Sequence, residues 1–443
     1  MKKLSLVFAV AAAMAAWGET PKNVILFIGD GMSTPQRMTA EEFSLASRGR
    51  GLELNHLPVQ AMTRTASATS LVTDSAAAAT AIACGEKTYN GAVGVDKDGK
   101  RIESCAEAAR DAGKKVGIVT SVTMNHATPS GFYAHRAQRS MLYEIGLDLI
   151  ASGFDFFAGG GMDGKANNEE SKEYQGNLYE IAATNGYTVA CGKEEFASLH
   201  PGMGKIWYRD GEKAIGWAID GPREEGQPRL PDLTRLAIEC LDSEEGFFLM
   251  VEGGAVDWAG HANEAAVNLR DLLELEDAVN VALAYRNSHP DTLVVVTGDH
   301  ETGGMSMGFA GTGYAFYMDR LANQTRSTDA FKKLVKYEKD GGTWDGAKAL
   351  LEESYGFKFE GDEKADPMVL TEKERTRLAN SFKEERLPDT ARRIISEKAG
   401  VGWTSGSHTA LPVLTTSIGP GSERFSGLLD NTDISKIIKS FYR

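Results

Sequence analysis

A serine at the start of a predicted helix is the first residue whose position favours chemistry. It lies in VTDSAAAAT, residues 72–80, where Asp74 is a favourable N-cap and the alanines that follow are strong helix formers. Ser75 is therefore expected in the first turn, where free backbone N–H groups and the helix dipole stabilise an anion. A serine alkoxide or a phosphoserine would be such an anion. The alternative is a capped, alanine-rich core helix without chemistry.

Three apolar runs predict buried parallel strands that each end in an acidic residue. The runs begin at residues 23, 247 and 292, and the acids are Asp30, Glu252 and Asp299. Open α/β sheets bind ligands at the carboxyl ends of their strands, so we expect these side chains in one crevice. The alternative for Asp30 is a role in a tight turn.

Four of the eight histidines stand near predicted strand ends. Asp257 and His261 are four residues apart and share one face of a helical turn, and a carboxylate with an imidazole suits zinc. The other candidates are His126 and Thr128 after a strand predicted at 116–121, His300 after Asp299, and His408 on a Gly/Ser loop before a last strand predicted at 412–418. This set exceeds one zinc site, so it predicts two zinc ions about 4 Å apart and an oxygen-rich site for magnesium.

Two further patterns bear on the substrate. Arg136 and Arg139 are candidates to hold phosphate oxygens, because a guanidinium can bind two at once, although surface arginines are the usual case. Residues 33–37, STPQR, fit the Ser/Cys-x-Pro-x-Arg pattern from which sulfatases make formylglycine. We interpret that match as accidental because so short a pattern often occurs by chance, but it makes a sulfatase the rival hypothesis.

The elements that must position these residues indicate an α/β fold. An alanine-rich helix at 103–112 precedes the strand at 116–121 and completes a βαβ crossover. Residues from about 165 to 231 are polar with weak periodicity and predict surface loops and short helices without chemistry. Residues 309–399 contain charged amphipathic helices, such as the one near 371–382, and predict an insertion or cap over the site.

Composition and the N-terminus indicate an exported protein. Residues 1–18 have the basic start, apolar run and small residues of a secretory signal, too short to span a membrane comfortably, with a buried helix as the alternative. The net charge of −14 argues against a nucleic-acid partner and predicts a soluble protein. The pairing of the cysteines stays open: Cys84, Cys105, Cys191 and Cys240.

Six motifs in order resemble alkaline phosphatase across nearly the whole chain after residue 18, apart from 309–399. They are IGDGM from Ile28, VTDSAAAATA from Val72, HATP from His126, VEGGAVDWAGHAN from Val251, TGDHETGG from Thr297 and SGSHT from Ser405. The resemblance implies a three-layer α/β/α sandwich with a mostly parallel central sheet and an inserted cap or crown. Residues 19–443 would then form one catalytic domain with the insertion at 309–399.

The resemblance also implies roles for individual residues. Ser75 is the residue phosphorylated in turnover and a ligand in the metal site, and Arg139 grips the substrate phosphate beside Asp74. The first Zn²⁺ would be bound by Asp257, His261 and His408, the second by Asp30, Asp299 and His300, and one Mg²⁺ by Asp30, Thr128 and Glu252. Two positions vary in the family: His126 stands where some members have aspartate beside magnesium, and Trp258 replaces a lysine or histidine that reaches the phosphate through water.

The expected function is hydrolysis of small-molecule phosphate monoesters through a phosphoserine, with release of inorganic phosphate. Activity should rise toward alkaline pH because zinc-bound water must be deprotonated. We expect a secreted or periplasmic enzyme with no membrane span and no nucleic-acid partner, and a homodimer is an open alternative to a monomer. The rivals are a sulfatase or phosphodiesterase on the same metal scaffold, and a secreted metal-binding protein without catalysis.

Overall fold

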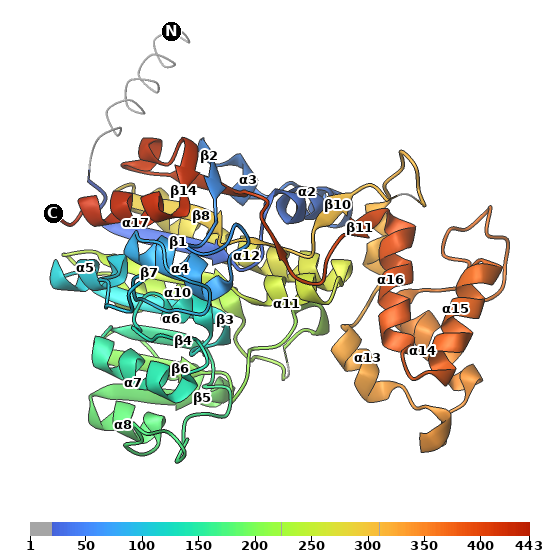
Figure 1. Ribbon diagram of the computed structural model, residues 1–443, viewed down its shortest axis with the longest axis horizontal. Coiled ribbons are helices and arrows are strands. Elements are labelled where there is room, and N and C mark those ends of the chain that lie inside the picture. Colours follow the sequence, from blue (N-terminus) through green and yellow to red (C-terminus); the bar gives the residue numbers. More distant parts are fainter. Residues whose placement is uncertain (1–19, 223, 310) are drawn as a thin grey trace, which may run out of the picture.

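The computed structural model describes residues 20–443 apart from 223 and 310, so the predicted signal at 1–18 lies outside the described residues. Its centre is a ten-stranded sheet with helices on both faces (Figure 1), which confirms the expected α/β fold. In spatial order the strands are β14 (Gly427–Asp430), β2 (Val59–Arg64), β13 (Val413–Ile418), β8 (Thr292–Gly298), β1 (Asn23–Gly29), β7 (Phe247–Gly253), β3 (Lys115–Thr123), β4 (Phe156–Gly160), β6 (Lys205–Arg209) and β5 (Tyr187–Cys191).

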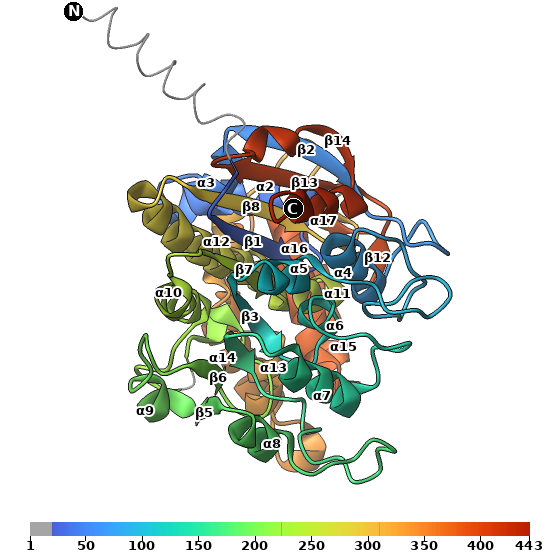
Figure 2. The ribbon, with the colours of Figure 1, turned by 90° about the vertical axis from the view of Figure 1, so that its left-hand side faces the viewer.

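The middle of the sheet is buried on both faces, which explains the unbroken apolar run of β1. Ile25 and Phe27 belong to one core and Val24, Leu26 and Ile28 to the other, because successive strand side chains point to opposite faces. The first core includes α2 (Thr34–Arg48), α10 (Leu230–Leu241) and α12 (Ala265–Ser288). The second includes α4 (Ser75–Cys84), α5 (Cys105–Asp111), α7 (Leu142–Ser152) and α17 (Asn431–Ser440). Figure 2 shows α10 and α12 on one side of the sheet and α4 and α7 on the other.

Shorter elements connect these layers. They are α3 (Glu53–His56), α6 (Ala127–Ser130), α8 (Leu178–Thr184), α9 (Gly192–Phe196), η1 (Ala218–Asp220), α11 (Ala255–His261) and η4 (Ser422–Arg424). Two small antiparallel pairs stand apart from the main sheet: β9 (Glu301–Thr302) with β12 (His408–Thr409), and β10 (Met305–Met307) with β11 (Val401–Trp403).

The structure corrects the prediction for residues 165–231. This region contributes β5 and β6, which complete one side of the main sheet, and Trp207 and Tyr208 of β6 are buried. Each strand has five residues in a polar setting, too short for a clear period. One further expectation was wrong, because β13 is not the last strand and β14 follows it. β3 pairs with β7 and β4.

Strand direction explains why one candidate residue precedes a strand while the others follow strands. β13 runs antiparallel to both of its neighbours, β8 and β2, whereas the other described pairs in this sheet are parallel. The start of β13 therefore lies at the edge where the parallel strands end. His408 comes shortly before β13 and reaches the same edge as Asp30 and Asp299.

The segment predicted as an insertion is helical and lies beside one end of the molecule (orange in Figure 1). Its elements are η2 (Met318–Asn323), α13 (Thr328–Leu334), η3 (Glu338–Asp340), α14 (Trp344–Tyr355), α15 (Glu372–Lys383) and α16 (Leu387–Ala399). Leu321 and Ile394 are fully buried in the same core as Ile25 and Phe27. The segment thus continues the core on one face of the sheet.

Two other observations bear on earlier expectations. Within the described residues, no helix combines the length and the apolar character needed to cross a membrane. The four cysteines are all described and all carry free thiols.

The shared core predicts that a cavity in the insertion weakens the whole protein. Leu321→Ala should lower the free energy of unfolding by about 2–5 kcal/mol, because the lost packing is deep in the common core. Leu334→Ala, at a side chain that is 53% exposed, is the matched control and should change it by less than about 0.5 kcal/mol. Denaturant unfolding followed by circular dichroism measures both, and a separate early transition in Leu321→Ala would contradict the shared core.

Candidate active site and metal centre

Three neighbouring strands end at the same level and bring their acids together. Gly29 of β1 is in register with Gly253 of β7 and Gly298 of β8. Asp30 and Asp299, which follow β1 and β8, therefore leave the sheet side by side, and Glu252 is the penultimate residue of β7. All three carboxylates are fully buried. The strand pattern of the sequence correctly predicted that they meet.

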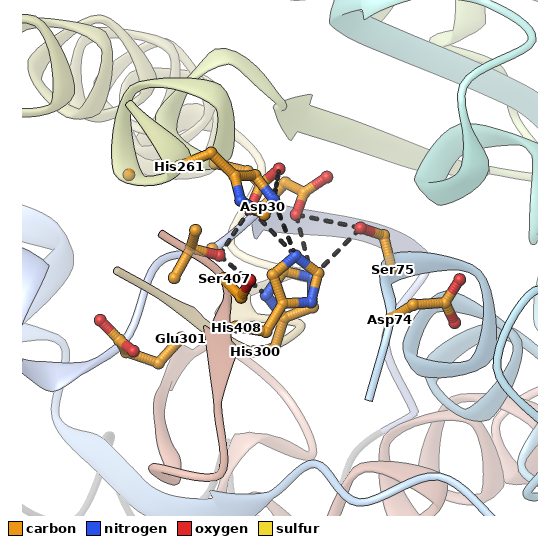
Figure 3. Close-up of polar contacts among 12 residues, drawn as sticks. Asp30, Asp74, Ser75, His261, His300, Glu301, Ser407 and His408 are labelled. Carbon is orange, nitrogen blue, oxygen red and sulfur yellow. Dashed lines mark hydrogen bonds and ion pairs between the residues drawn. The ribbon is translucent and has the colours of Figure 1, made fainter. Parts of the chain in front are cut away.

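Ser75 opens α4 as the sequence predicted. The side chain of Asp74 caps the helix by accepting a hydrogen bond from the N–H of Ala77 at 3.0 Å. Ser75 is 2% exposed, and its Oγ lies 3.1 Å from Nε2 of His300 and 3.5 Å from Oδ1 of Asp30. Figure 3 shows the hydroxyl directed at these two side chains. The helix thus presents its first hydroxyl to the group of acids and histidines.

Asp257, His261 and His408 form a first cluster. Nε2 of His261 lies 3.1 Å from Nε2 of His408, and each nitrogen lies 3.4 Å from a carboxylate oxygen of Asp257. The Nδ1 atoms of both imidazoles lie 2.8 Å from backbone carbonyls, of Gly406 and Thr73, so Nδ1 is the protonated nitrogen and Nε2 carries a lone pair. Two facing lone pairs beside a carboxylate suit a cation. The spacings match the edges of a tetrahedron of zinc ligands, about 3.3 Å.

His300, Asp30 and Asp299 form a second cluster beside the first. Nε2 of His300 lies 3.3 Å from an oxygen of Asp30 and 3.3 Å from an oxygen of Asp299, and the Ser75 hydroxyl adds a third oxygen at a similar distance. His300 is also close to the first cluster, because its ring stacks on that of His408 with centroids 3.6 Å apart. We place His300 in the second cluster because its nitrogen faces both of those carboxylates.

Asp30, His126 and Glu252 form a third cluster that shares Asp30 with the second. Nδ1 of His126 lies 3.9 Å from Asp30 and 3.8 Å from Glu252, so this cluster is wider. Thr128 donates to the second oxygen of Asp30 at 3.2 Å, and Thr120 donates to Glu252 at 2.5 Å. Its mainly oxygen donors are the kind that magnesium binds.

The buried carboxylates of the three clusters need cations nearby to be stable as anions. Burial, followed by the charge of Asp299, raises the pKa of Asp30 well above its ordinary value. Burial likewise raises the pKa of Asp299 to about 7 and lowers the pKa of His300 well below its ordinary value. Burial also opposes the charge of Asp257, but the neighbouring imidazoles, with His408 the strongest, outweigh it and lower the pKa of Asp257. Several buried carboxylates in contact are stable as anions only when positive charge compensates them.

Unpartnered atoms in the clusters also fit metal ligands. Nδ1 of His126, Oε1 of Glu252 and Oδ2 of Asp299 are buried and have no hydrogen-bond partner among the described residues. Buried polar atoms are rarely left unpaired, so each needs a partner of another kind. The donor set therefore fits bound cations at all three clusters. None of the three clusters draws on the described part of residues 309–399.

The structure separates the candidates for substrate binding. Arg139 lies beside Ser75's helix, where it donates to Asp74 at 3.1 Å and approaches Nε2 of His126 at 3.4 Å. Its side chain is 33% exposed, so it can reach a ligand. Arg136 is instead held by Asp148 and Glu173 in ion pairs of 2.7 and 2.8 Å, which is a structural role.

The sulfatase-like pattern is occupied by structural contacts. Ser33 is fully buried at the start of α2, and its hydroxyl donates to the carbonyl of Pro412 at 2.8 Å. Arg37 is also fully buried and donates to Asn55 and to the carbonyl of Leu414. Both polar side chains serve to join α2 to β13.

Sequence reasoning missed the residues that orient the ligands. Thr302 donates to Asp257 at 2.5 Å and lies 3.3 Å from Nδ1 of His300, so it joins the first two clusters. The sequence pattern had marked it only as part of a turn. Gly31 has a φ of +70°, and a Cβ there would lie 2.8 Å from the Thr302 hydroxyl. The only sign in the sequence of this close approach to Thr302 is that the residue after Asp30 is a glycine.

Glu301 is a second residue that the sequence did not single out. It is fully buried, lies to the left of His300 and His408 in Figure 3, and accepts four hydrogen bonds. The donors are Gln36 at 2.6 Å, the Gly304 N–H at 3.0 Å, the Met305 N–H at 3.1 Å and Thr409 at 2.5 Å. This carboxylate therefore fixes the turn after Asp299 and His300 to the strand that carries His408.

Comparisons with known proteins agree on one family. The family model of alkaline phosphatase matches residues 21–443. Alkaline phosphatase 3 of Bacillus subtilis is 32% identical over 427 residues, which cover 94% of this chain and 87% of that protein. The crystal structure of a cold-active alkaline phosphatase from Shewanella sp. has a TM-score of 0.82 at 28% identity and covers 95% of this chain and 100% of that one. A third similar structure is a histidine-to-glutamate variant of the alkaline phosphatase from the Antarctic bacterium TAB5, solved with Mg bound in its M3 site. It has a TM-score of 0.69 at 27% identity, and the match covers 96% of this chain and 98% of that one.

The hydrogen bonds of Glu301 predict that its charge and shape are both needed. In Glu301→Gln one carboxylate oxygen becomes an NH₂ group that faces N–H or O–H donors, so buried donors lose their acceptor. The free energy of unfolding should fall by about 1–3 kcal/mol. Glu363→Gln, at an exposed carboxylate, is the control. Thermal unfolding of both variants under the same conditions measures the difference, and equal stability would show that Glu301 does not fix the turn.

Proposed function

The chain belongs to the alkaline phosphatase family and is a phosphate monoester hydrolase, and we propose that Ser75 is its nucleophile. The observation that carries this proposal is the Ser75 hydroxyl at the N-terminus of α4, within 3.1–3.5 Å of His300 and Asp30. An oxygen at this position would lie next to the cations that the buried carboxylates require, and the N-terminus of the helix favours a negative charge. The hydroxyl is therefore the group best placed to become an alkoxide.

The three clusters support a specific set of metals. We assign the first Zn²⁺ to Asp257, His261 and His408, whose imidazole nitrogens and spacing suit tetrahedral zinc. We assign the second Zn²⁺ to Asp30, Asp299, His300 and Ser75. The third cluster would hold Mg²⁺ through Asp30, Glu252 and Thr128, with His126 beside it. The Mg held in the M3 site of the TAB5 variant supports a third site of this kind. When bound, such ions act as Lewis acids that lower the pKa of oxygen nucleophiles and stabilise a leaving oxygen.

The residues of the chain carry the two displacements. In the first, Ser75 Oγ forms a bond to phosphorus while the bond from phosphorus to the alcohol oxygen breaks, and the alcohol takes up the proton that the serine loses. In the second, water attacks phosphoserine, and Ser75 and inorganic phosphate are released. Arg139 holds phosphate oxygens through its guanidinium, which Asp74 orients from the other side.

The rival functions lack the same support. A sulfatase that used Ser33 would need that side chain at the metals, whereas it is buried against the carbonyl of Pro412. A metal-binding protein without catalysis would not need a serine hydroxyl and an arginine at the edge of the clusters. Ser75 and Arg139 together favour a phosphate monoester.

Two broader features belong to the same proposal. The pattern at residues 1–18 supports export to the periplasm or the medium. We treat residues 19–443 as one catalytic domain in which 309–399 is an insertion that shapes access to the site rather than its chemistry. The core that this insertion shares with α2 and α12 supports a single unit.

Metal removal tests the assignment of the clusters. Purified protein should contain about two zinc ions and one magnesium ion per chain by elemental analysis. Dialysis against a chelator should abolish hydrolysis of an aryl phosphate and lower the melting temperature, because bound ions stabilise the folded state and their loss leaves buried carboxylates uncompensated. Added zinc should restore activity, and full activity with a single metal per chain would contradict the assignment.

Labelling tests the nucleophile. Wild-type protein quenched in acid with radiolabelled phosphate should carry label on the peptide that contains Val72 to Thr80. Ser75→Ala should carry none there, although it should retain its metals because the other ligands remain. Slow residual hydrolysis in that variant is expected, since water can still attack the bound ester. Ser33→Ala is the matched control and should be labelled like the wild type; label on another peptide would identify a different nucleophile.

A further inference from the structure

Two tryptophans lie in a row beside the groups assigned to the phosphate. Trp258 packs edge-on against His126, with ring centroids 5.9 Å apart, and His126 in turn approaches Arg139 at 3.4 Å. Trp217 continues the row outward, 6.2 Å from Trp258 and again edge-on. Both tryptophans are half-buried, so part of each ring is open to solvent. We call Trp217 and Trp258 the aromatic wall.

Trp217 is fixed in place from the insertion and from α12. Its indole N–H donates to Asp329 of α13 at 3.1 Å. Three residues later, Asp220 accepts hydrogen bonds of 2.7 and 2.6 Å from the N–H and hydroxyl of Ser327, which caps α13. Between them, the N–H of Ala218 donates to buried Asp271 of α12 at 3.1 Å. A half-exposed ring that is tethered in this way loses little entropy when it contacts a ligand.

The position of the wall is related to the site of the displacement. Ser75 lies with the second cluster, and an in-line displacement places the leaving alcohol oxygen on the side of phosphorus opposite Ser75 Oγ. Trp258 directly follows Asp257 of the first cluster, and His261 lies one turn further along the same helix, α11. The Trp258 ring contacts His126, which approaches Arg139, so the aromatic wall begins beside the residues assigned to the substrate phosphate and leads outward from them.

We propose that the aromatic wall binds the alcohol portion of the substrate and that the enzyme prefers phosphate monoesters whose alcohol carries an aromatic ring. This inference rests on the proposed function and adds a substrate class to it. The wall has no charge of its own, so it discriminates through apolar and ring–ring contact, whereas Arg139 and the metals recognise the phosphate that all monoesters share. Trp217 is the specificity-determining residue, because it is farther from the phosphate and depends on the insertion for its position.

Two esters that differ only in the ring test this proposal. 2-Phenylethyl phosphate and ethyl phosphate have alcohols of similar acidity, so the ratio of their kcat/KM values reports contact with the ring rather than ease of bond cleavage. Wild type should favour the phenylethyl ester. Trp217→Ala should lower the ratio about 3- to 10-fold, the size expected for the loss of one aromatic pair. Trp217→Leu, which keeps more of the side-chain volume, should lower it similarly, and Trp217→Phe should change it by less than about 3-fold.

Two more variants separate the wall from general effects. Asp329→Ala keeps the ring but removes its tether, and should lower the ratio by an intermediate factor. Tyr314→Ala, at a fully exposed ring elsewhere in the insertion, should leave the ratio unchanged. An unchanged ratio in folded Trp217→Ala and Trp217→Leu, or an equal loss for both esters, overturns the inference while hydrolysis itself upholds the proposed function. Failure of wild type to hydrolyse either ester would instead overturn the proposed function.

Discussion

The mutual repulsion of buried carboxylates is the constraint on which the rest of this site depends. The register of β1, β7 and β8 sets Asp30, Glu252 and Asp299 at one level, and burial raises the pKa of both aspartates. Such a group is costly in a protein interior unless cations are shared among its members. Asp30 contributes one oxygen to the second cluster and the other to the third, so a single side chain couples two of the proposed metal sites. The sheet supplies rigidity that loops alone could not, because each of these strands is held by ladders on both sides.

The histidines depend on a second layer of contacts that fixes which nitrogen is free. The backbone carbonyls of Thr73 and Gly406 accept hydrogen bonds from Nδ1 of His408 and of His261, respectively, and each carbonyl lies far in sequence from the histidine that it orients. Thr73 lies two residues before Ser75, so the segment that leads into α4 and its proposed nucleophile also orients His408 of the first cluster. The antiparallel course of β13 makes this contact feasible, because it returns His408 to the edge where the parallel strands end.

Most of the residues of the candidate site could be brought together from local sequence patterns, and the reason is physical. An apolar run that ends in Asp or Glu indicates both a buried strand and an acidic side chain at its carboxyl end, as at Asp30 and Asp299. In the same way, a capping residue before a run of alanines indicates the start of a helix, which places Ser75 in its first turn. Contacts between distant segments leave no such pattern. Thr302 was predicted only as part of a turn and Glu301 was not singled out, because both depend on pairing with the distant strand of His408. β5 and β6 were missed because strands of only five residues within a polar stretch of sequence have little periodicity. The antiparallel direction of β13 could not be inferred either, since it depends on the whole topology.

The aromatic wall shows why the insertion is best understood together with the site. Asp30 and Asp299 follow strands of the central sheet and Ser75 opens α4, and none of these elements lies in residues 309–399. Trp217 differs, because its ring is tethered through Asp329 to α13 and its loop through Asp220 to Ser327. A change in the insertion can therefore move the surface that meets the alcohol without moving the groups that meet the phosphate. This division lets recognition of the alcohol vary at small cost in catalysis, because loops tolerate substitution that a ligand-bearing strand end does not.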